Sequence, residues 1–141
     1  CVGEFMADKT FKLEIVTPKK LVYSGDVQSF TAPGVVGSFQ VLYNHAPLLS
    51  AIAVGEVKLR DEQGNELRYA TSGGFVDVVK NNVTMLAETA ERADEIDVQR
   101  AQAAKERAAK RLSERHTEID VDRVRIALSR AINRLKIAQR G

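Results

Sequence analysis

The chain has 141 residues, of which 44% are hydrophobic and 28% charged, and a formal net charge of +2. This composition is typical of a globular protein with one or two small domains. The longest apolar stretch, Leu48 to Val54, is far below the ~20 residues needed to cross a bilayer, so we expect no direct membrane insertion. Because Cys1 is the only cysteine, an intramolecular disulfide and a cysteine-rich metal site are excluded.

We expect residues 1–9 to be a flexible N-terminus, with Met6 as the natural start and the residues before it of other origin. From Phe11 onward apolar and polar residues alternate, and Phe11, Leu13 and Ile15 predict a half-buried β-strand. Similar short runs follow without helical patterns between them, which predicts an antiparallel β-sandwich over residues 10–92. The further predicted strands are 21–23, 27–32, 38–42, 51–54, 56–60, 66–71, 75–79 and 83–87. A turn is predicted at 24–26, between the strands 21–23 and 27–32.

The periodicity changes near Glu88, where alanine, arginine and other charged residues replace the glycines and aromatics. Asp94 is the expected N-cap of a helix that runs to about Leu112. After a short connection, Thr117 or Asp120 is expected to cap a second helix that runs nearly to the C-terminus. Residues 93–141 are therefore predicted to form an antiparallel two-helix hairpin, which completes an α+β fold.

The apolar seam of this hairpin is narrow and rich in alanine. At ~0.8 kcal/mol per buried methylene, alanines stabilise a seam much less than leucines do, so the hairpin should be marginal alone. Ile126, Ile132 and Ile137 lie outside the seam, and we expect them to pack on the sandwich or on another protein. The predicted seam consists of Val98, Ala101, Ala108 and Leu112 in the first helix and Val121, Val124, Leu128, Ala131, Leu135 and Ala138 in the second.

Charge is distributed unevenly along the chain. Residues 1–93 hold nine Lys/Arg and eleven Asp/Glu, whereas residues 94–141 hold twelve and eight. The last nineteen residues contain no acid, which predicts that the second helix meets a negatively charged partner. Their six cations are Arg123, Arg125, Arg130, Arg134, Lys136 and Arg140.

No catalytic constellation or metal site is recognisable in the sequence. Ser72-Gly73-Gly74 precedes a predicted strand and lacks an adjacent lysine, so it indicates a tight turn and not a phosphate-binding loop. His45 has no second His or Cys nearby, and His116 is expected to be solvated in the interhelix connection. A nucleic-acid-binding helical hairpin remains as the alternative function, although the hairpin has no aromatic residue to stack on bases.

Three stretches together resemble the epsilon subunits of bacterial F-type ATP synthases. They are Phe39 to Leu49 with His45-Ala46-Pro47-Leu48, the run Ser72 to Val78 followed by Val83-Thr84-Met85-Leu86, and Ile96-Asp97-x-x-Arg100-Ala101. The resemblance extends from about Thr10 to the C-terminus. It implies a ten-stranded β-sandwich followed by a helical hairpin, in agreement with the periodicities.

The resemblance also implies a role for the chain. It would be a non-catalytic subunit of the central stalk, the rotor of a proton-translocating complex, which joins the gamma subunit to the c-subunit ring. Its C-terminal helices would extend toward the alpha and beta catalytic subunits and inhibit ATP hydrolysis. The expected location is the cytoplasmic face of the bacterial plasma membrane, as a peripheral protein without nucleic acid partners.

The loop that would face the c ring departs from the family pattern. Many members read Gly-Glu-Leu-Gly-Ile-(Leu or Tyr)-Pro-Gly-His, whereas this chain has Ser38 in place of the acid and Tyr43-Asn44 in place of Pro-Gly. The resemblance predicts contacts with the ring and gamma through Ser38, Phe39, Tyr43 and His45.

The motif that begins at Ile96 has two interpretations. In the structural one, Asp97 complements the helix dipole and Arg100 is solvated. In the functional one, implied by the resemblance, ATP is a regulatory ligand although no cofactor is required. Carried over by position, the residues at this site are Ile96 and Asp97 on the adenine side, Arg100 and Ala101 flanking the nucleotide, Arg107, Arg130 and Arg134 facing the phosphates, and Glu91 nearby.

Overall fold

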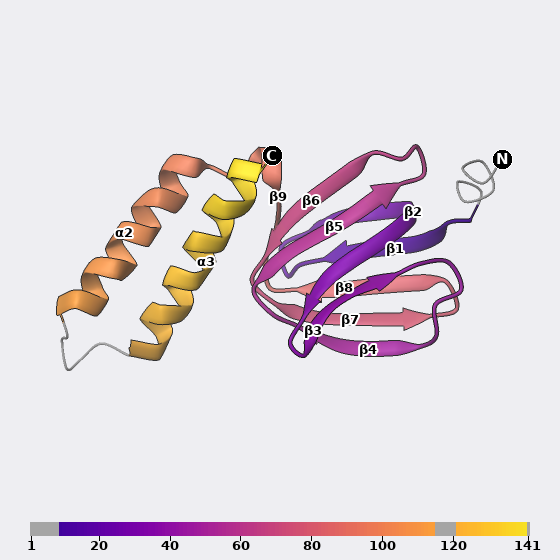
Figure 1. The fold of residues 1–141 in the computed structure, drawn as a ribbon, viewed down its shortest axis with the longest axis horizontal. Coiled ribbons are helices and arrows are strands. Elements are labelled where there is room, and N and C mark those ends of the chain that lie inside the picture. Colours follow the sequence, from indigo (N-terminus) through magenta and orange to yellow (C-terminus); the bar gives the residue numbers. More distant parts are fainter. Residues whose placement is uncertain (1–8, 115–120, 141) are drawn as a thin grey trace. The chain divides into compact units, whose positions relative to one another are not determined.

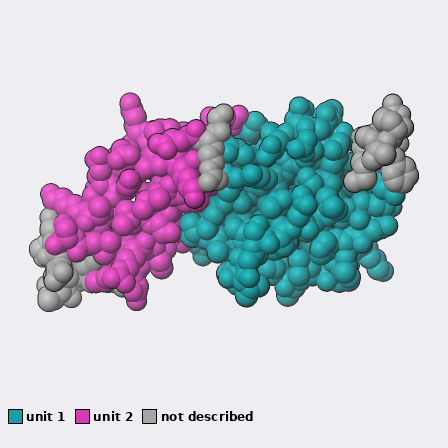
Figure 2. Space-filling model, viewed as in Figure 1, with its two compact units in different colours: residues 1–92 teal, residues 93–141 magenta. Residues whose placement is uncertain are grey.

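The computed structural model describes residues 9–114 and 121–140. The chain divides into two compact units, Cys1–Arg92 and Ala93–Gly141, which we call the β unit and the helical unit (Figure 2). Among the described residues, no helix is both long and apolar enough to span a membrane. The expectations for residues 1–8 and for Thr117, Asp120 and His116 lie outside the described part of the chain.

The β unit confirms the predicted β-sandwich, with nine strands among the described residues instead of the implied ten. The last of them, β9, was absent from the predicted set. The strands are β1 (Phe11–Val16), β2 (Leu21–Gly34), β3 (Gly37–Val41), β4 (Leu48–Ile52), β5 (Gly55–Asp61), β6 (Glu66–Thr71), β7 (Gly74–Val79), β8 (Asn82–Ala87) and β9 (Ala90–Arg92) (Figure 1).

Strand β2 belongs to both layers of the sandwich. One layer has the order β1-β8-β7-β4 and the other the order β2-β5-β6-β9, and β2 also pairs with β1, β3 and β4. The pair β1–β8 is parallel, and every other described pair is antiparallel. A strand shared in this way joins the two layers through backbone hydrogen bonds as well as through the core (Figure 1).

The predicted turn at 24–26 is wrong, because these residues continue β2. Ser24 and Gly25 pair with Glu14 and Leu13 of β1. Their backbone groups thus find partners in the sheet, which overrides the local turn preference of Ser, Gly and Asp. The two predicted runs 21–23 and 27–32 are accordingly parts of one 14-residue strand.

The core lies between the two layers and follows the alternation of the strands. Phe11, Leu13 and Ile15 are buried while Lys12 is exposed, as predicted. The cluster continues through the inward positions of the other strands, including Phe30, Val76 and Met85. Side chains on the opposite side of each strand face outward, where they can contact other molecules.

In the helical unit, a short 3₁₀ turn, η1 (Ala93–Glu95), precedes α2 (Val98–Glu114) and α3 (Val121–Arg140). The prediction that Asp94 caps the first helix is wrong, because Asp94 lies in η1. Asp97 takes this role: its Oδ1 accepts a hydrogen bond from the Arg100 amide at 3.0 Å, and its carbonyl accepts one from Ala101 at 3.0 Å.

The helices α2 and α3 pack against each other, as predicted for a hairpin. Ala101 and Ala108 are buried in α2, and Val124, Ala131 and Leu135 are buried in α3. The outermost seam positions, Val98 and Val121, are 47% and 44% exposed. Outside the seam, Ile126 and Ile132 are exposed and Ile137 is buried.

Candidate functional site

The four residues predicted to contact the c ring and gamma lie along β3 and in the loop that follows it. Ser38 lies beside the turn that joins β2 to β3, Phe39 lies at the centre of β3, and Tyr43 and His45 lie in the loop after β3. A strand of five residues extends ~16 Å. The structure therefore offers two candidate contact regions.

The first region is an apolar hairpin tip. Val35 and Val36 at the turn are 60% and 96% exposed, and Ser38 beside them is also exposed. Phe39 is half-buried, with its ring close to Gly34. Two neighbouring valines in water carry an unfavourable hydration free energy that a partner would relieve.

The second region is the loop at 42–47. Its chain reverses through a hydrogen bond from the His45 amide to the carbonyl of Leu42 at 3.1 Å. The imidazole Nδ1 of His45 lies 2.7 Å from the carbonyl oxygen of Ala46. Tyr43 is 40% exposed, and the Lys9 ammonium stands 5.9 Å from its ring centroid. The loop thus presents an exposed aromatic side chain and, two residues later, a half-buried imidazole.

A further surface was missed from the sequence: an apolar row across the outer face of the β1-β8-β7-β4 layer. Val16 pairs with Leu86, Leu86 with Phe75, and Phe75 with Ala51. Paired residues project from the same face of a sheet, so these four side chains are neighbours. Leu49, two residues before Ala51, extends the row on the same face.

The exposure of this row is unusual for a sheet face. Leu49, Phe75 and Leu86 are 74%, 57% and 55% exposed. A contiguous exposed apolar patch marks a binding surface more often than isolated exposed residues do. The sequence signal was present, because Leu48-Leu49 and Met85-Leu86-Ala87 place apolar residues on both faces of their strands.

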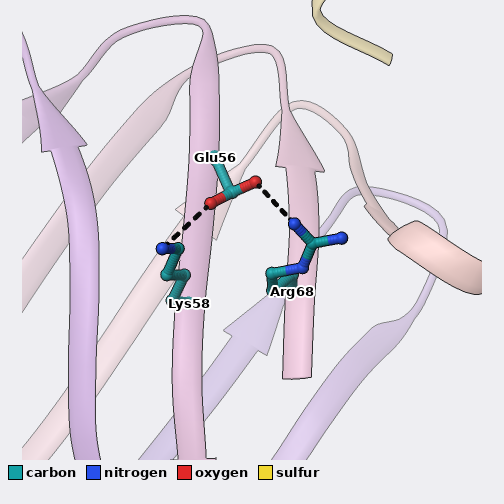
Figure 3. Close-up of polar contacts among 3 residues, drawn as sticks. All are labelled: Glu56, Lys58 and Arg68. Carbon is teal, nitrogen blue, oxygen red and sulfur yellow. Dashed lines mark hydrogen bonds and ion pairs between the residues drawn. The ribbon is translucent and has the colours of Figure 1, made fainter. Parts of the chain in front are cut away.

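The outer face of the other layer is charged. Glu56 of β5 forms an ion pair with Lys58, whose Nζ lies 3.6 Å from Oε1, and its Oε2 accepts a hydrogen bond from Arg68 of β6 at 3.4 Å (Figure 3). The Glu56 and Arg68 side chains are only 12% and 16% exposed. Glu91 of β9 pairs with Ala70, which also pairs with Glu56, so Glu91 faces the same side as this group.

Seven of the eight predicted ATP-binding residues belong to the helical unit, whereas Glu91 belongs to the β unit. Ile96 and Ala101 are buried, and the Asp97 side chain is occupied in capping α2. Arg100 and Arg107 are exposed, and Arg130 and Arg134 are half-buried. Each of these arginines directly precedes a buried seam residue, namely Ala101, Ala108, Ala131 or Leu135.

The basic residues of α3 differ in exposure. Arg123, Arg125 and Lys136 are exposed, in contrast to the half-buried Arg130 and Arg134. The side chain of Arg140 lies outside the described part of the structure. Within the residues that the structure describes, no group of three or more His, Cys, Asp or Glu side chains could hold a metal ion.

Comparison with known proteins identifies the family. The family described as "ATP synthase, Delta/Epsilon chain, beta-sandwich domain" matches residues 10–93, and the one described as "ATP synthase, Delta/Epsilon chain, long alpha-helix domain" matches residues 94–139. An ATP synthase epsilon chain of Syntrophomonas wolfei is 49% identical over 107 residues, which cover 76% of this chain and 78% of the relative. That of Pelotomaculum thermopropionicum is 49% identical over 108 residues, covering 77% and 80%.

A solved structure has the same fold. It is a chain of the Euglena gracilis mitochondrial ATP synthase, with a TM-score of 0.80, 22% identity, and coverage of 93% of this chain and 82% of that one. The predicted resemblance and fold class are confirmed, and the family is one of non-catalytic subunits, as predicted. The chain belongs to the delta/epsilon chain family of ATP synthases and is similar to bacterial epsilon chains.

Proposed function

We propose that the chain is the epsilon subunit of the central stalk in a bacterial F-type ATP synthase, where its β unit couples the gamma subunit to the c-subunit ring. The apolar row carries this proposal, because a surface of this kind needs a permanent partner to shield it. We assign the row to gamma, and the hairpin tip and the 42–47 loop to the ring. The complex would hold the chain on the cytoplasmic face of the plasma membrane as a peripheral protein.

The test is recovery of gamma by variants of the row. Phe75→Ser removes a side chain that is 57% exposed. If gamma covers roughly 100 Å² of it, the loss is about 2.5 kcal/mol, or a roughly 70-fold weaker complex. Val98→Ser is the matched control, since Val98 is also apolar and about half exposed but lies in α2. Equal recovery of gamma by both variants would refute the assignment.

We further propose that the helical unit holds ATP as a regulatory ligand. Two antiparallel helices keep equivalent seam-flanking positions on the same side of the pair. Since Arg100, Arg107, Arg130 and Arg134 all directly precede seam residues, they flank one side of the hairpin. Such a cluster of guanidinium groups suits a polyphosphate, whose oxygens accept paired hydrogen bonds from arginine.

Calorimetric titration with ATP tests this ligand. Arg134→Ala should weaken binding at least tenfold, whereas Arg125→Ala, an exposed arginine of the same helix, should bind like the wild type. Bound ATP would favour the packed hairpin only if its affinity for that form exceeds its affinity for an extended one. Equal affinity of the two variants would remove the phosphate role of Arg134.

The basic α3 would inhibit ATP hydrolysis by docking, in an extended form, on gamma and on an acidic segment of a catalytic beta subunit. Its exposed cations Arg123, Arg125 and Lys136 supply the charge. Inhibition should therefore weaken as the salt concentration rises, and also in a variant that carries glutamine in place of all three cations. The alternative of nucleic-acid binding finds no support among the relatives, which are named as epsilon chains.

A further inference from the structure

A pair of asparagines joins the 42–47 loop to the turn between β7 and β8. The backbone amide of Asn44 donates a hydrogen bond to Oδ1 of Asn81 at 2.7 Å, and the side-chain Nδ2 of Asn81 donates one to Oδ1 of Asn44 at 3.0 Å. The two residues are 37 positions apart in the sequence, so this contact is tertiary. Both distances are within the range of good hydrogen bonds.

Asn81 also holds a third segment. Its backbone carbonyl accepts a hydrogen bond from the amide of Lys12, at the start of β1, at 3.0 Å. The residue thus connects the loop, the β7–β8 turn and the first strand at one edge of the sheet. Within the described part of the chain, the 42–47 loop contacts Asn81 through these two hydrogen bonds and Lys9 through the Tyr43 ring.

The backbone at Asn44 explains why the loop needs such support. Asn44 has a φ of +63°, in the left-handed region that most side chains avoid and that glycine and asparagine tolerate. The residue before Asn44 is Tyr43 and the proline of the loop comes only at Pro47, so no fixed proline φ stiffens the chain at Asn44. The hydrogen bonds to Asn81 restore a defined conformation by another route.

We infer that Asn81 is a positioning residue for the contact between the 42–47 loop and the membrane-embedded rotor ring. Tyr43 and His45 flank Asn44, so fixing Asn44 fixes the direction in which both side chains project. The inference rests on the proposed function, since it concerns how one of the proposed contact regions is held. Asn81 itself belongs to none of the predicted contact residues.

The turn chemistry at Asn81 allows a clean test. Lys80 and Asn81 have φ values of +46° and +63°, which is the pattern of a type I′ turn that favours glycine at its second central position. Asn81→Gly therefore keeps the turn while removing both hydrogen bonds to Asn44. Asn81→Asp keeps an acceptor for the Asn44 amide, and Lys80→Gly changes the same turn without touching the pair.

The first measurement is hydrogen exchange of the Asn44 backbone amide by NMR in the isolated protein. We expect exchange to be at least tenfold faster in Asn81→Gly and close to the wild-type rate in Asn81→Asp and Lys80→Gly. An unchanged rate in Asn81→Gly would show that the pair does not hold the loop, and would overturn the inference whatever the function of the chain.

The second measurement is ATP-driven proton uptake per ATP hydrolysed in membrane vesicles that carry the assembled complex. We expect Asn81→Gly to lower this ratio at least twofold, with Asn81→Asp and Lys80→Gly like the wild type and melting temperatures of the isolated subunits unchanged. A normal ratio in Asn81→Gly overturns the inference. If Tyr43→Ala and His45→Ala lower the ratio in that case, the contact stands and only the role of Asn81 fails; if they do not, the contact proposal fails as well.

Discussion

Replacing Asp97 by alanine should selectively destabilise the first turns of α2. The substitution removes the acceptor of the Arg100 amide, a hydrogen bond of 3.0 Å, and leaves that donor to water. Loss of an N-cap side chain costs about 1 kcal/mol, and loss of a carboxylate at the positive end of the helix dipole adds about 0.5 kcal/mol. The sum of about 1.5 kcal/mol corresponds to a roughly 12-fold larger population of the locally opened helix.

Amide hydrogen exchange followed by NMR measures this population residue by residue. We expect the amides of Ala101 to Lys105 to exchange roughly tenfold faster in Asp97→Ala, while amides of the β core such as Leu13 and Met85 keep their rates. Asp97→Ser is the matched control, because serine caps a helix as well as aspartate does. Exchange in Asp97→Ser should differ from the wild type only by the smaller charge effect.

Equal exchange rates in the wild type and in Asp97→Ala would refute the assignment of Asp97 as the cap that stabilises α2. The same variants separate two possible roles of the residue. If Asp97 only caps the helix, Asp97→Ser binds ATP like the wild type. If its carboxylate also contacts the nucleotide, Asp97→Ser loses affinity although its helix remains intact.

Two further predictions concern the β unit. Gly74→Ala should lower the free energy of unfolding in urea by about 3 kcal/mol or more, because a Cβ there would meet the Leu86 carbonyl oxygen and lie 2.8 Å from the Ala87 Cα. Gly64→Ala, with φ +87° but in open space, should lower it by only about 1 kcal/mol. Equal losses in the two variants would exclude crowding as the cause. Burial, and then the charges of Asp61, Glu62 and Asp26, raise the pKa of Tyr23 above its ordinary 10.0. The stability that the neutral phenol contributes is therefore fully present below pH 10.0 and is lost as pH rises through the raised pKa. The absorbance titration of the wild type minus that of Tyr23→Phe should therefore have its midpoint above 10.0, and a midpoint at or below 10.0 would contradict this account.

The strands were predictable where alternation and burial agree, as in Phe11, Leu13 and Ile15. The prediction failed at Ser24-Gly25-Asp26, where local turn preference yields to pairing with β1. Such pairing joins residues that are distant in sequence, so a local pattern cannot show it. For the same reason the hydrogen bonds between Asn44 and Asn81 were not predictable, although each asparagine alone suggests a turn.

The helix start shows a different limit. Asp94 and Asp97 are both acceptable caps by residue type, and they are three positions apart. The choice depends on the 3₁₀ turn η1, which contains Asp94 and carries no sequence signal of comparable strength. The apolar row, by contrast, is visible in the sequence as apolar residues on both faces of β7 and β8. A strand that is buried on both faces has the same pattern as a strand with one apolar face exposed for a partner, so the sequence does not distinguish the two.

The division into a firm β unit and a weakly packed helical unit is the central claim of this account. All three tyrosines lie before residue 93, so tyrosine fluorescence reports the β unit, whereas circular dichroism at about 222 nm is dominated by the helices. We predict that in urea the dichroism signal is lost at a lower concentration than the tyrosine signal, because the buried side chains of α2 are alanines. Coincident transitions would mean that the two units unfold as one, which would contradict the claim.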